Sequence, residues 1–364
     1  MEERAWLVLA DGTVYAGTVA GARGRTYGEI VFNTSMTGYE EILTDPSYAG
    51  QIVTMTFPLI GNYGANDDDW ESRAIQAAGM VMREECPRPS HWRARGDLRG
   101  FLEAHGVPAI AGIDTRALTR RLRSSGVMMA AIATDGTPEE ILAWLKEQPV
   151  YGTTDLARAV ATPAPFVWPA EGEERGHLVV LDEGLKYNIL RLLNVRGYRT
   201  TTLPCTVSAE DVLALKPEGV VLSPGPGDPV QLDYMVRNTA KLVGRVPILG
   251  ICLGHQVLGQ VFGARTYKLK FGHHGSNHPV KDLISGEVHI TSQNHGYAID
   301  GDALRGGAEV SHVNLNDGTC EGLHHRDLPI VSIQYHGEAA PGPRDNVYLF
   351  ERFLRMVEAN KGGA

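Results

Sequence analysis

Short apolar runs alternate with helical patterns along the second half of the chain. Residues 177–182 (HLVVLD) form a mostly apolar run, as a buried parallel strand does, and apolar residues at 185, 189, 190, 192 and 193 follow with helical spacing. Further strands are predicted near residues 200–203, 219–222 and 246–251, with a helix opened by Ser208. Repeated strand–helix units predict an α/β fold with a doubly wound parallel sheet and function at the carboxyl ends of its strands.

The first half of the chain is less regular. Residues 5–9 and 29–33 alternate apolar and polar positions as strands do, and residues 114–122 have the pattern of a helix capped by Asp114. This half is therefore predicted to be a mixed α/β domain.

A stretch rich in proline, glycine and charge separates the two halves. It has little apolar periodicity, which is typical of a linker. The predicted organisation is an N-terminal domain over residues 1–160, a linker over 161–176 and a C-terminal domain over 177–364.

Composition narrows the class of protein. Of 364 residues, 43% are hydrophobic and 21% charged, and 34 basic residues against 43 acidic ones give a net charge of −9. The acidic balance argues against nucleic acid or an anionic membrane as the main partner. No apolar run approaches the roughly 20 residues of a bilayer span, and the start of the chain lacks a signal pattern. A cytoplasmic location is expected.

The four cysteines, Cys86, Cys205, Cys252 and Cys320, lie far apart and form no CxxC pair. A disulfide framework is not expected at this size and in this compartment. Each cysteine is therefore considered alone, and the default for a lone cysteine is a small buried apolar residue.

Cys252 stands in the segment GICLGHQ (residues 250–256), after a predicted strand and before a predicted helix. This pattern matches the nucleophile elbow, with cysteine in place of serine. The helix N-terminus favours thiolate over thiol, and the N–H of Leu253 is suitably placed to stabilise an oxyanion. The alternative is a buried cysteine in a glycine-rich turn.

A cysteine nucleophile needs a base, and the base needs an orienting group. His336 and Glu338, in YHGE, follow the apolar run of residues 329–333, and their side chains would share one side of an extended segment. Taken alone they are a surface histidine and a solvated carboxylate. Together with Cys252 they indicate a Cys–His–Glu triad.

Two other segments carry candidate chemistry. The loop of residues 223–229 (SPGPGDP) suggests phosphate binding or a second oxyanion donor from Gly225, and the second fits better because no P-loop pattern occurs. His273, His274 and His278 lie in FGHHGSNHP (271–279). Zinc binding is considered, but no cysteine or acidic ligand accompanies them locally, so loop structure or substrate lining is favoured and no metal is expected.

The second half resembles the class I (triad) glutamine amidotransferases, on the strength of GICLGHQ and the later His-x-Glu. The whole chain resembles the small, glutaminase subunits of carbamoyl-phosphate synthase. The segments that carry the second resemblance are residues 31–51 (VFNTSMTGYEEILTDPSYAGQ), 61–62, 111–119 (AGIDTRALT), 222–229, 270–280 (KFGHHGSNHPV) and 293–297 (QNHGY).

The resemblance implies a role for individual residues. Cys252 would be the nucleophile, His336 the general base and acid, and Glu338 the group that holds His336. The backbone amides of Leu253 and Gly225 would form the oxyanion hole. The residues implied to bind glutamine are Ser47, Gly225, Gly227, Leu253, Gln256, Asn294, Gly296 and Tyr297.

The resemblance also implies a partner. Ammonia from glutamine would pass to a large subunit, which makes carbamoyl phosphate from bicarbonate, ammonia and two ATP for arginine and pyrimidine synthesis. No cofactor is expected in this chain; ATP and Mg or K ions would bind the large subunit. The complex would be a heterodimer or a higher oligomer of heterodimers. The alternatives are the glutaminase subunit of another synthase, such as one making anthranilate or GMP, and a catalytically weak scaffold.

Two segments depart from the family's usual pattern. Gly337 replaces the proline between the triad His and Glu, which predicts looser positioning of His336. In residues 182–188 (DEGLKYN), Glu183 replaces an expected aromatic residue, and Leu185 and Tyr187 also differ. These changes predict that the packing beside the site differs from that of the family.

Overall fold

The computed structural model describes residues 3–361, and these cluster into two compact units. The first contains the described residues up to Thr154 together with Lys270–Gly275; the second contains Asp155–Leu269 and the chain from Ser276 onward. The boundary therefore falls before the predicted end of the first domain at residue 160. The outermost residues of the predicted domain ranges, 1–2 and 362–364, lie outside the described residues.

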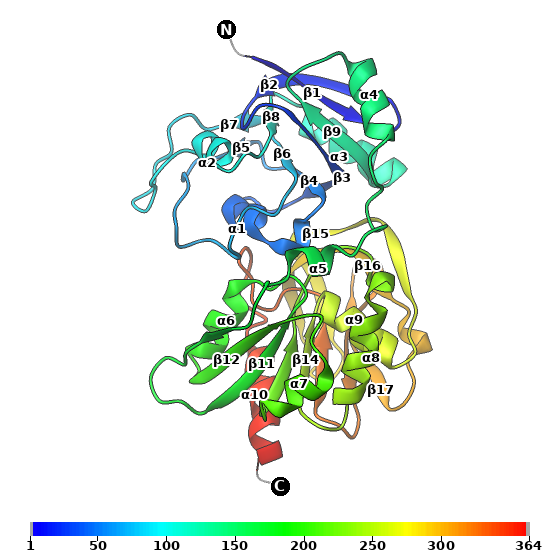
Figure 1. Cartoon of the computed structure of the whole chain (residues 1–364). Coiled ribbons are helices and arrows are strands. Elements are labelled where there is room, and N and C mark those ends of the chain that lie inside the picture. Colours follow the sequence, from blue (N-terminus) through cyan, green and yellow to red (C-terminus); the bar gives the residue numbers. More distant parts are fainter. Residues whose placement is uncertain (1–2, 362–364) are drawn as a thin grey trace. The chain divides into compact units, whose positions relative to one another are not determined.

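The first unit contains a closed barrel whose strand order is β1-β2-β8-β6-β4-β3-β9 (Figure 1). These strands are β1 (Arg4–Leu9), β2 (Val14–Val19), β3 (Arg25–Asn33), β4 (Gln51–Met55), β6 (Gly79–Val81), β8 (Ala109–Ala111) and β9 (Met128–Ala133). A separate pair consists of β5 (Leu59–Ile60) and β7 (Glu84–Glu85). The helices are α1 (Tyr39–Thr44), α2 (Leu98–Ala104), α3 (Thr115–Ser125) and α4 (Pro138–Lys146), with a 3-10 turn, η1 (Pro46–Tyr48).

Alternation along the barrel strands divides the core of the first unit. One apolar cluster joins Leu7, Ile30 and Ile52 to Leu118 and Leu122 of α3. A second cluster lies against α1 and α2, and a third against α4. The mixed α/β character predicted from the sequence is present, but the alternating strands did not by themselves predict closure into a barrel. The predicted cap is present, since Asp114 accepts a hydrogen bond from the N–H of Ala117 at the start of α3.

The second unit contains a ten-stranded sheet with the order β10-β12-β11-β13-β14-β19-β18-β17-β15-β16. Its strands are β10 (Phe166–Trp168), β11 (Gly176–Asp182), β12 (Tyr198–Pro204), β13 (Gly219–Leu222), β14 (Ile248–Ile251), β15 (Thr266–Asp282), β16 (Val288–Ile299), β17 (Ala308–Asn314), β18 (Cys320–His325) and β19 (Ile330–Ile333). Its helices are α5 (Leu156–Val160), α6 (Tyr187–Asn194), α7 (Ala209–Ala214), α8 (Asp233–Leu242), α9 (Leu253–Val261) and α10 (Tyr348–Lys361), with 3-10 turns η2 (Pro229–Leu232) and η3 (Gly301–Ala303).

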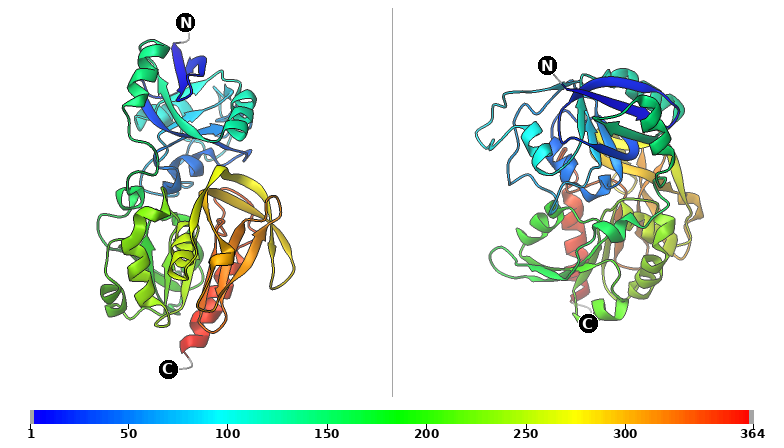
Figure 2. Two further views of the ribbon diagram at one scale, coloured as in Figure 1. Left: turned by 90° about the vertical axis from the view of Figure 1, so that its right-hand side faces the viewer. Right: turned by 45° about the horizontal axis from the view of Figure 1, so that its top comes forward.

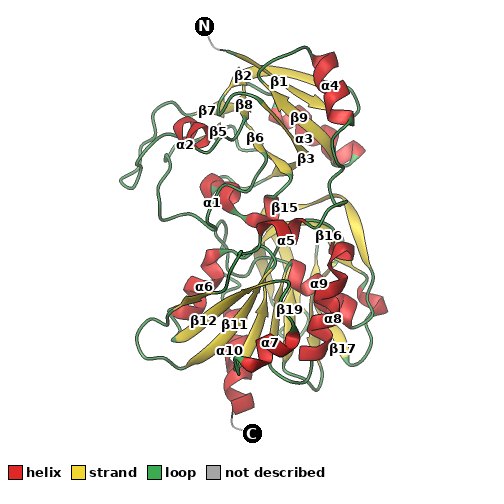
Figure 3. Ribbon diagram, viewed as in Figure 1, coloured by secondary structure: helices red, strands yellow, loops and turns green. Residues whose placement is uncertain are grey.

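Helices cover both faces of this sheet (Figures 2 and 3). One apolar cluster packs α7, α8 and α9 on one face, and a second packs α6 and α10 on the other. The five central strands, β12, β11, β13, β14 and β19, are parallel, so the predicted doubly wound sheet is confirmed. The antiparallel strands that extend it were not predicted.

The predicted linker of residues 161–176 is part of the second unit. Residues 166–168 form β10, which pairs antiparallel with β12 at the edge of the sheet. Thr162 is also anchored, because its N–H donates to Asp182 at 2.8 Å. None of the helices within residues 3–361 is long and apolar enough to cross a membrane.

The register of the parallel strands brings three loops together. Leu181 of β11 lies opposite Leu222 of β13, which in turn lies opposite Gly250 of β14. The strands therefore end at the same level, as the carboxyl edge of a parallel sheet does. The loops after β11, β13 and β14 meet at this edge.

Glu183, just after β11, is an exception to the apolar packing. It is fully buried, and in the described part of the chain neither of its carboxyl oxygens has a hydrogen-bond partner. Burial, and secondarily the charge of Asp182, raise the pKa of Glu183 well above its ordinary value. The side chain is therefore a neutral acid in the folded protein and destabilises it wherever the unfolded chain would ionise.

We expect Glu183→Leu to stabilise the protein by about 1–3 kcal/mol at pH 8, because it removes a buried polar group without a partner. Below pH 4.5, the ordinary pKa of a glutamate, the Glu183 carboxyl is neutral in both the folded and the unfolded chain. As pH rises above 4.5, the unfolded chain ionises while the raised pKa keeps the folded side chain protonated, so the folded state loses stability. The wild type should lose stability relative to both Glu183→Leu and Glu183→Gln between about pH 5 and pH 8. Calorimetric unfolding measures this; a wild type as stable as Glu183→Leu at pH 8 contradicts it.

Candidate active site

Cys252 occupies the turn between β14 and α9. Its backbone has φ 52° and ψ −102°, a conformation that L-residues rarely adopt. The N–H of Cys252 donates to the carbonyl of Ile333 at 2.8 Å, so the strained residue is tied to the end of β19. This is the strand–turn–helix geometry of a nucleophile elbow.

The two flanking glycines make the turn possible. A Cβ at Gly250 would lie 2.7 Å from the carbonyl oxygen of Gly254, and one at Gly254 would lie 2.4 Å from the carbonyl oxygen of Leu222. Both distances are to backbone atoms, which cannot move aside without opening the turn. Glycine at these two positions is thus a steric requirement.

The Cys252 thiol is buried, with 2% of the residue exposed. It donates to the backbone carbonyl of Asn294 across 3.6 Å, and Nε2 of Gln334 donates to its sulfur across 3.7 Å. Leu253 is the first residue of α9, so its N–H belongs to the helix-initial amides that have no intrahelical acceptor. A partial positive charge therefore lies next to the sulfur.

His336 and Glu338 form a direct pair. Nδ1 of His336 lies 2.6 Å from Oε1 of Glu338, and both side chains are buried. The sequence predicted that they alternate along an extended segment, but β19 ends at Ile333 and residues 337–338 form a turn. The turn brings the two side chains onto one another. The N–H of His336 donates to the carbonyl of Ser292 at 2.9 Å, which anchors the segment.

Lys186 is a buried cation beside this pair and was not predicted as a site residue. Its Nζ lies 3.2 Å from Oε1 of Glu338 and donates to the carbonyl of Ala339 at 2.6 Å. Asn188 donates to the carbonyl of Glu338 at 2.6 Å. The sequence signal was available, since Lys186 is the one basic residue of the DEGLKYN segment.

The opposite charges of Lys186, His336 and Glu338 shift one another's pKa values. Burial would raise the pKa of Glu338, but Lys186 and His336 outweigh it and hold that pKa below its ordinary value. Burial would lower the pKa of His336, but the charge of Glu338 outweighs burial and raises it. Within residues 3–361, Nε2 of His336 has no hydrogen-bond partner, so it is available to exchange a proton. Glu338 is thus a carboxylate that accepts the Nδ1 proton of His336 and makes the ring a stronger base.

The second unit contains seven of the eight residues implied to bind glutamine. Asn294, Gly296 and Tyr297 lie on β16, Gln256 and Leu253 on α9, and Gly225 and Gly227 in the loop after β13.

Gly225 must be glycine for a steric reason. A Cβ there would lie 2.1 Å from the carbonyl oxygen of Glu183 and 2.8 Å from Cδ2 of Leu253. The loop after β13 is therefore packed tightly against the loop after β11 and the start of α9.

Ser47 lies in η1 of the first unit, where its N–H donates to the carboxylate of Asp45 at 2.9 Å. Its role toward glutamine stays a prediction from the resemblance. The histidines considered for zinc divide between the units: His273 and His274 fall in the stretch grouped with the first, and His278 in the second. The four cysteines are all free thiols.

Comparison with known proteins places the chain in a family. Residues 7–132 match "Carbamoyl-phosphate synthase small chain, CPSase domain", and residues 179–356 match "Glutamine amidotransferase class-I". The chain is 52% identical to the carbamoyl phosphate synthase small chain of Symbiobacterium thermophilum, over 96% of this chain and 98% of that one. It is 50% identical to the small chain of Akkermansia muciniphila, over 98% of each. The chain belongs to the carbamoyl-phosphate synthase small chains, and its second unit is a class I glutamine amidotransferase domain.

Proposed function

We propose that this chain hydrolyses the side-chain amide of glutamine with Cys252 as nucleophile, His336 as base and acid, and Glu338 as orienting group. The observation that carries the proposal is the strained Cys252 turn at the carboxyl edge of the sheet, beside a buried His336–Glu338 pair held at 2.6 Å. A buried cysteine in an ordinary glycine-rich turn would need neither the backbone strain nor the buried charges.

The first half of the reaction forms a thioester. His336 takes the thiol proton, and the Cys252 sulfur attacks the carboxamide carbon of glutamine. The carbonyl electrons move onto oxygen, and the N–H groups of Leu253 and Gly225 stabilise that oxyanion. As the oxyanion collapses, the C–N bond breaks and His336 gives its proton to the departing nitrogen. The products are ammonia and a glutamyl thioester on Cys252.

The second half releases glutamate. His336, now neutral, takes a proton from water, and the hydroxide formed attacks the thioester carbon. The C–S bond breaks, and the proton returns from His336 to the sulfur. Throughout both halves, Glu338 accepts from Nδ1 of His336, so that Nε2 is the nitrogen that exchanges protons with sulfur, nitrogen and water. Lys186 supports this role by keeping Glu338 ionised.

Glutamine would be held by residues around the thiol. The candidates in the second unit are Gly225, Gly227, Leu253, Gln256, Asn294, Gly296 and Tyr297. Gln256 is already oriented, because its Nε2 donates to the carbonyl of Tyr297 at 2.8 Å and to Oε1 of Gln334 at 3.0 Å. A fixed amide of this kind can recognise the polar groups of one substrate without reorganising.

Membership of the small chains implies a large-subunit partner. We propose that ammonia is channelled to that subunit, which would bind ATP and its Mg or K ions and make carbamoyl phosphate from bicarbonate, ammonia and two ATP. Carbamoyl phosphate would serve arginine and pyrimidine synthesis. A heterodimer is the simplest assembly, and the cytoplasmic location stays a prediction from the sequence.

Replacing the nucleophile tests the proposal most simply. With a carbamoyl-phosphate synthase large subunit and glutamine as nitrogen donor, Cys252→Ser should reduce synthesis by at least about a thousandfold. With ammonia as donor, synthesis should be retained, since the thiol acts only on glutamine. Cys205→Ser, at another buried thiol, is the matched control and should keep glutamine-dependent synthesis. Equal glutamine-dependent rates for Cys252→Ser and wild type overturn the proposal.

The replacement of proline by Gly337 gives a second prediction. Gly337 has no positive φ, its N–H makes no hydrogen bond in the described part of the chain, and a Cβ would meet Cδ1 of Ile333 at 3.0 Å and the carbonyl oxygen of Asn346 at 3.3 Å. Gly337→Pro therefore needs only a small shift and should give glutaminase activity equal to or higher than wild type, within about threefold. Steady-state glutaminase rates measure this; a loss of tenfold or more shows that the turn depends on glycine.

A further inference from the structure

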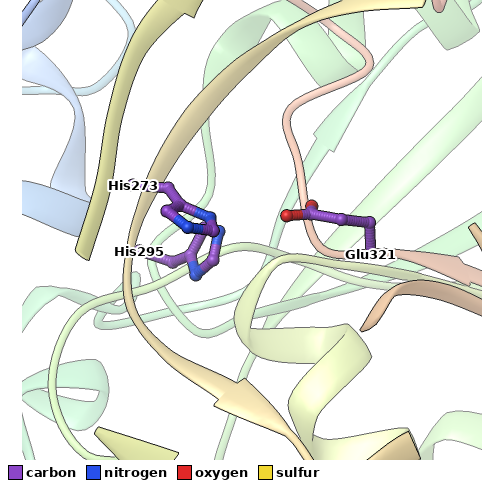
Figure 4. A group of neighbouring side chains, drawn as sticks. All are labelled: His273, His295 and Glu321. Carbon is purple, nitrogen blue, oxygen red and sulfur yellow. The ribbon is translucent and has the colours of Figure 1, made fainter. Parts of the chain in front are cut away.

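A second buried polar cluster involves β16, the strand that carries Asn294. Gln293 and His295 belong to β16 and Glu321 to β18, and each is at most 5% exposed. Figure 4 shows the His295 ring and the Glu321 carboxylate, together with His273 from the stretch of β15 grouped with the first unit. The proposed reaction assigns no role to Gln293, His295 or Glu321.

Hydrogen bonds fix the orientation of the Gln293 amide. Its Nε2 donates to Oε2 of Glu321 and to Oγ1 of Thr291, each at 3.0 Å. The other oxygen of Glu321 accepts from Nδ2 of Asn314 at 2.9 Å. Glu321 thus accepts hydrogen bonds from two side-chain amides. The opposite end of the Gln293 amide, Oε1, therefore faces Nε2 of His295, at 2.9 Å.

The same bonds set the protonation state of His295. Its Nε2 faces the Gln293 amide oxygen, and its Nδ1 lies 2.8 Å from the backbone carbonyl of Tyr297. Both of these oxygens can only accept, so hydrogen bonds at both ring nitrogens require two N–H groups, as an imidazolium has. The carboxylate of Glu321 supplies the opposite charge, with a His295 ring nitrogen and a Glu321 oxygen within 4.8 Å of each other.

Three other groups of the second unit that feel the charge of Glu321 are uncharged near neutral pH. Burial is the largest influence on Tyr267, Tyr335 and Cys320, and it raises the pKa of each, to about 12 for Cys320.

The cluster connects to the thiol through the substrate-binding residues. The carbonyl of Tyr297 accepts from His295 and also from Nε2 of Gln256, at 2.8 Å each. Gln256 donates to Oε1 of Gln334 at 3.0 Å, and Nε2 of Gln334 reaches the Cys252 sulfur across 3.7 Å. The hydrogen bonds thus orient the Gln256 side-chain amide, which in turn orients that of Gln334.

We propose that Glu321 is a positioning residue for glutamine: through Gln293 it keeps His295 doubly protonated, and the imidazolium holds the 294–297 segment and Gln256 in place beside Cys252. This inference rests on the proposed function, since it concerns the same substrate site. Glu321 acts on the proposed glutamine-binding residues through two intervening side chains, Gln293 and His295. It should therefore govern the affinity for glutamine more than the chemical step.

Kinetics of the complex with the large subunit test this role. Glu321→Gln keeps the shape but removes the charge, and it should raise the KM for glutamine about tenfold, the loss expected for one charge-assisted hydrogen bond. The kcat should stay within about twofold of wild type. Glu309→Gln, at an exposed carboxylate on the neighbouring β17, is the control and should change neither constant. A KM for Glu321→Gln within twofold of wild type overturns the proposal.

Nitrogen NMR of histidine-labelled protein tests the protonation state independently of catalysis. The wild-type His295 ring should show two protonated nitrogens near neutral pH, and Glu321→Gln should convert it to a neutral ring. A neutral ring in the wild type overturns the proposal even if the variant fails to fold. If Cys252→Ser retained glutamine hydrolysis, the proposed function would fail while the ring signal still reported on Glu321, so the two failures are distinguishable.

Discussion

The candidate site depends on one backbone constraint, the turn that holds Cys252 at φ 52° between β14 and α9. The turn closes only because Gly250 and Gly254 leave no side chain between backbone atoms. It places the sulfur at the start of a helix, beside the end of β19, so the chain that follows β19 can deliver His336 to it. A relaxed turn would move the thiol away from both the helix amides and the imidazole.

Buried charge is the second constraint, and it is balanced locally. Glu338 lies between Lys186 and His336, so each charge in the water-poor site has an opposite charge within hydrogen-bonding distance. In such surroundings a fixed charge acts strongly on its neighbours, because little solvent screens it. The proposed coupling of Glu321 to His295 through Gln293 follows the same rule. Glu183 shows the converse: burial without a hydrogen-bond partner among the described residues raises its pKa, which costs stability where the unfolded chain would ionise.

The sequence pattern predicted the parallel strands and the helix caps at Asp114 and Ser208. These features follow from local apolar spacing and local hydrogen bonds. It predicted neither the barrel of the first unit nor the antiparallel extension of the sheet, since closure and edge pairing depend on contacts distant in sequence. Cys252 was recognisable from its flanking glycines. Lys186 offered a signal as the one basic residue of DEGLKYN, but it was not predicted as a site residue. Gln293 and Glu321 offered none, because a buried polar group is identified by its partners, and Gln293 and Glu321 belong to different strands. The supposed linker looked irregular although β10 pairs there with β12.

The covalent intermediate is the most direct test of the central claim. The complex should be mixed with glutamine, quenched in acid within the first turnover, digested and examined by mass spectrometry. We expect one glutamyl group on the peptide that contains Cys252, and none on the peptides of Cys86, Cys205 or Cys320. Rapid hydrolysis of glutamine with no adduct on Cys252, or with the adduct on another cysteine, would contradict the assignment of Cys252 as nucleophile.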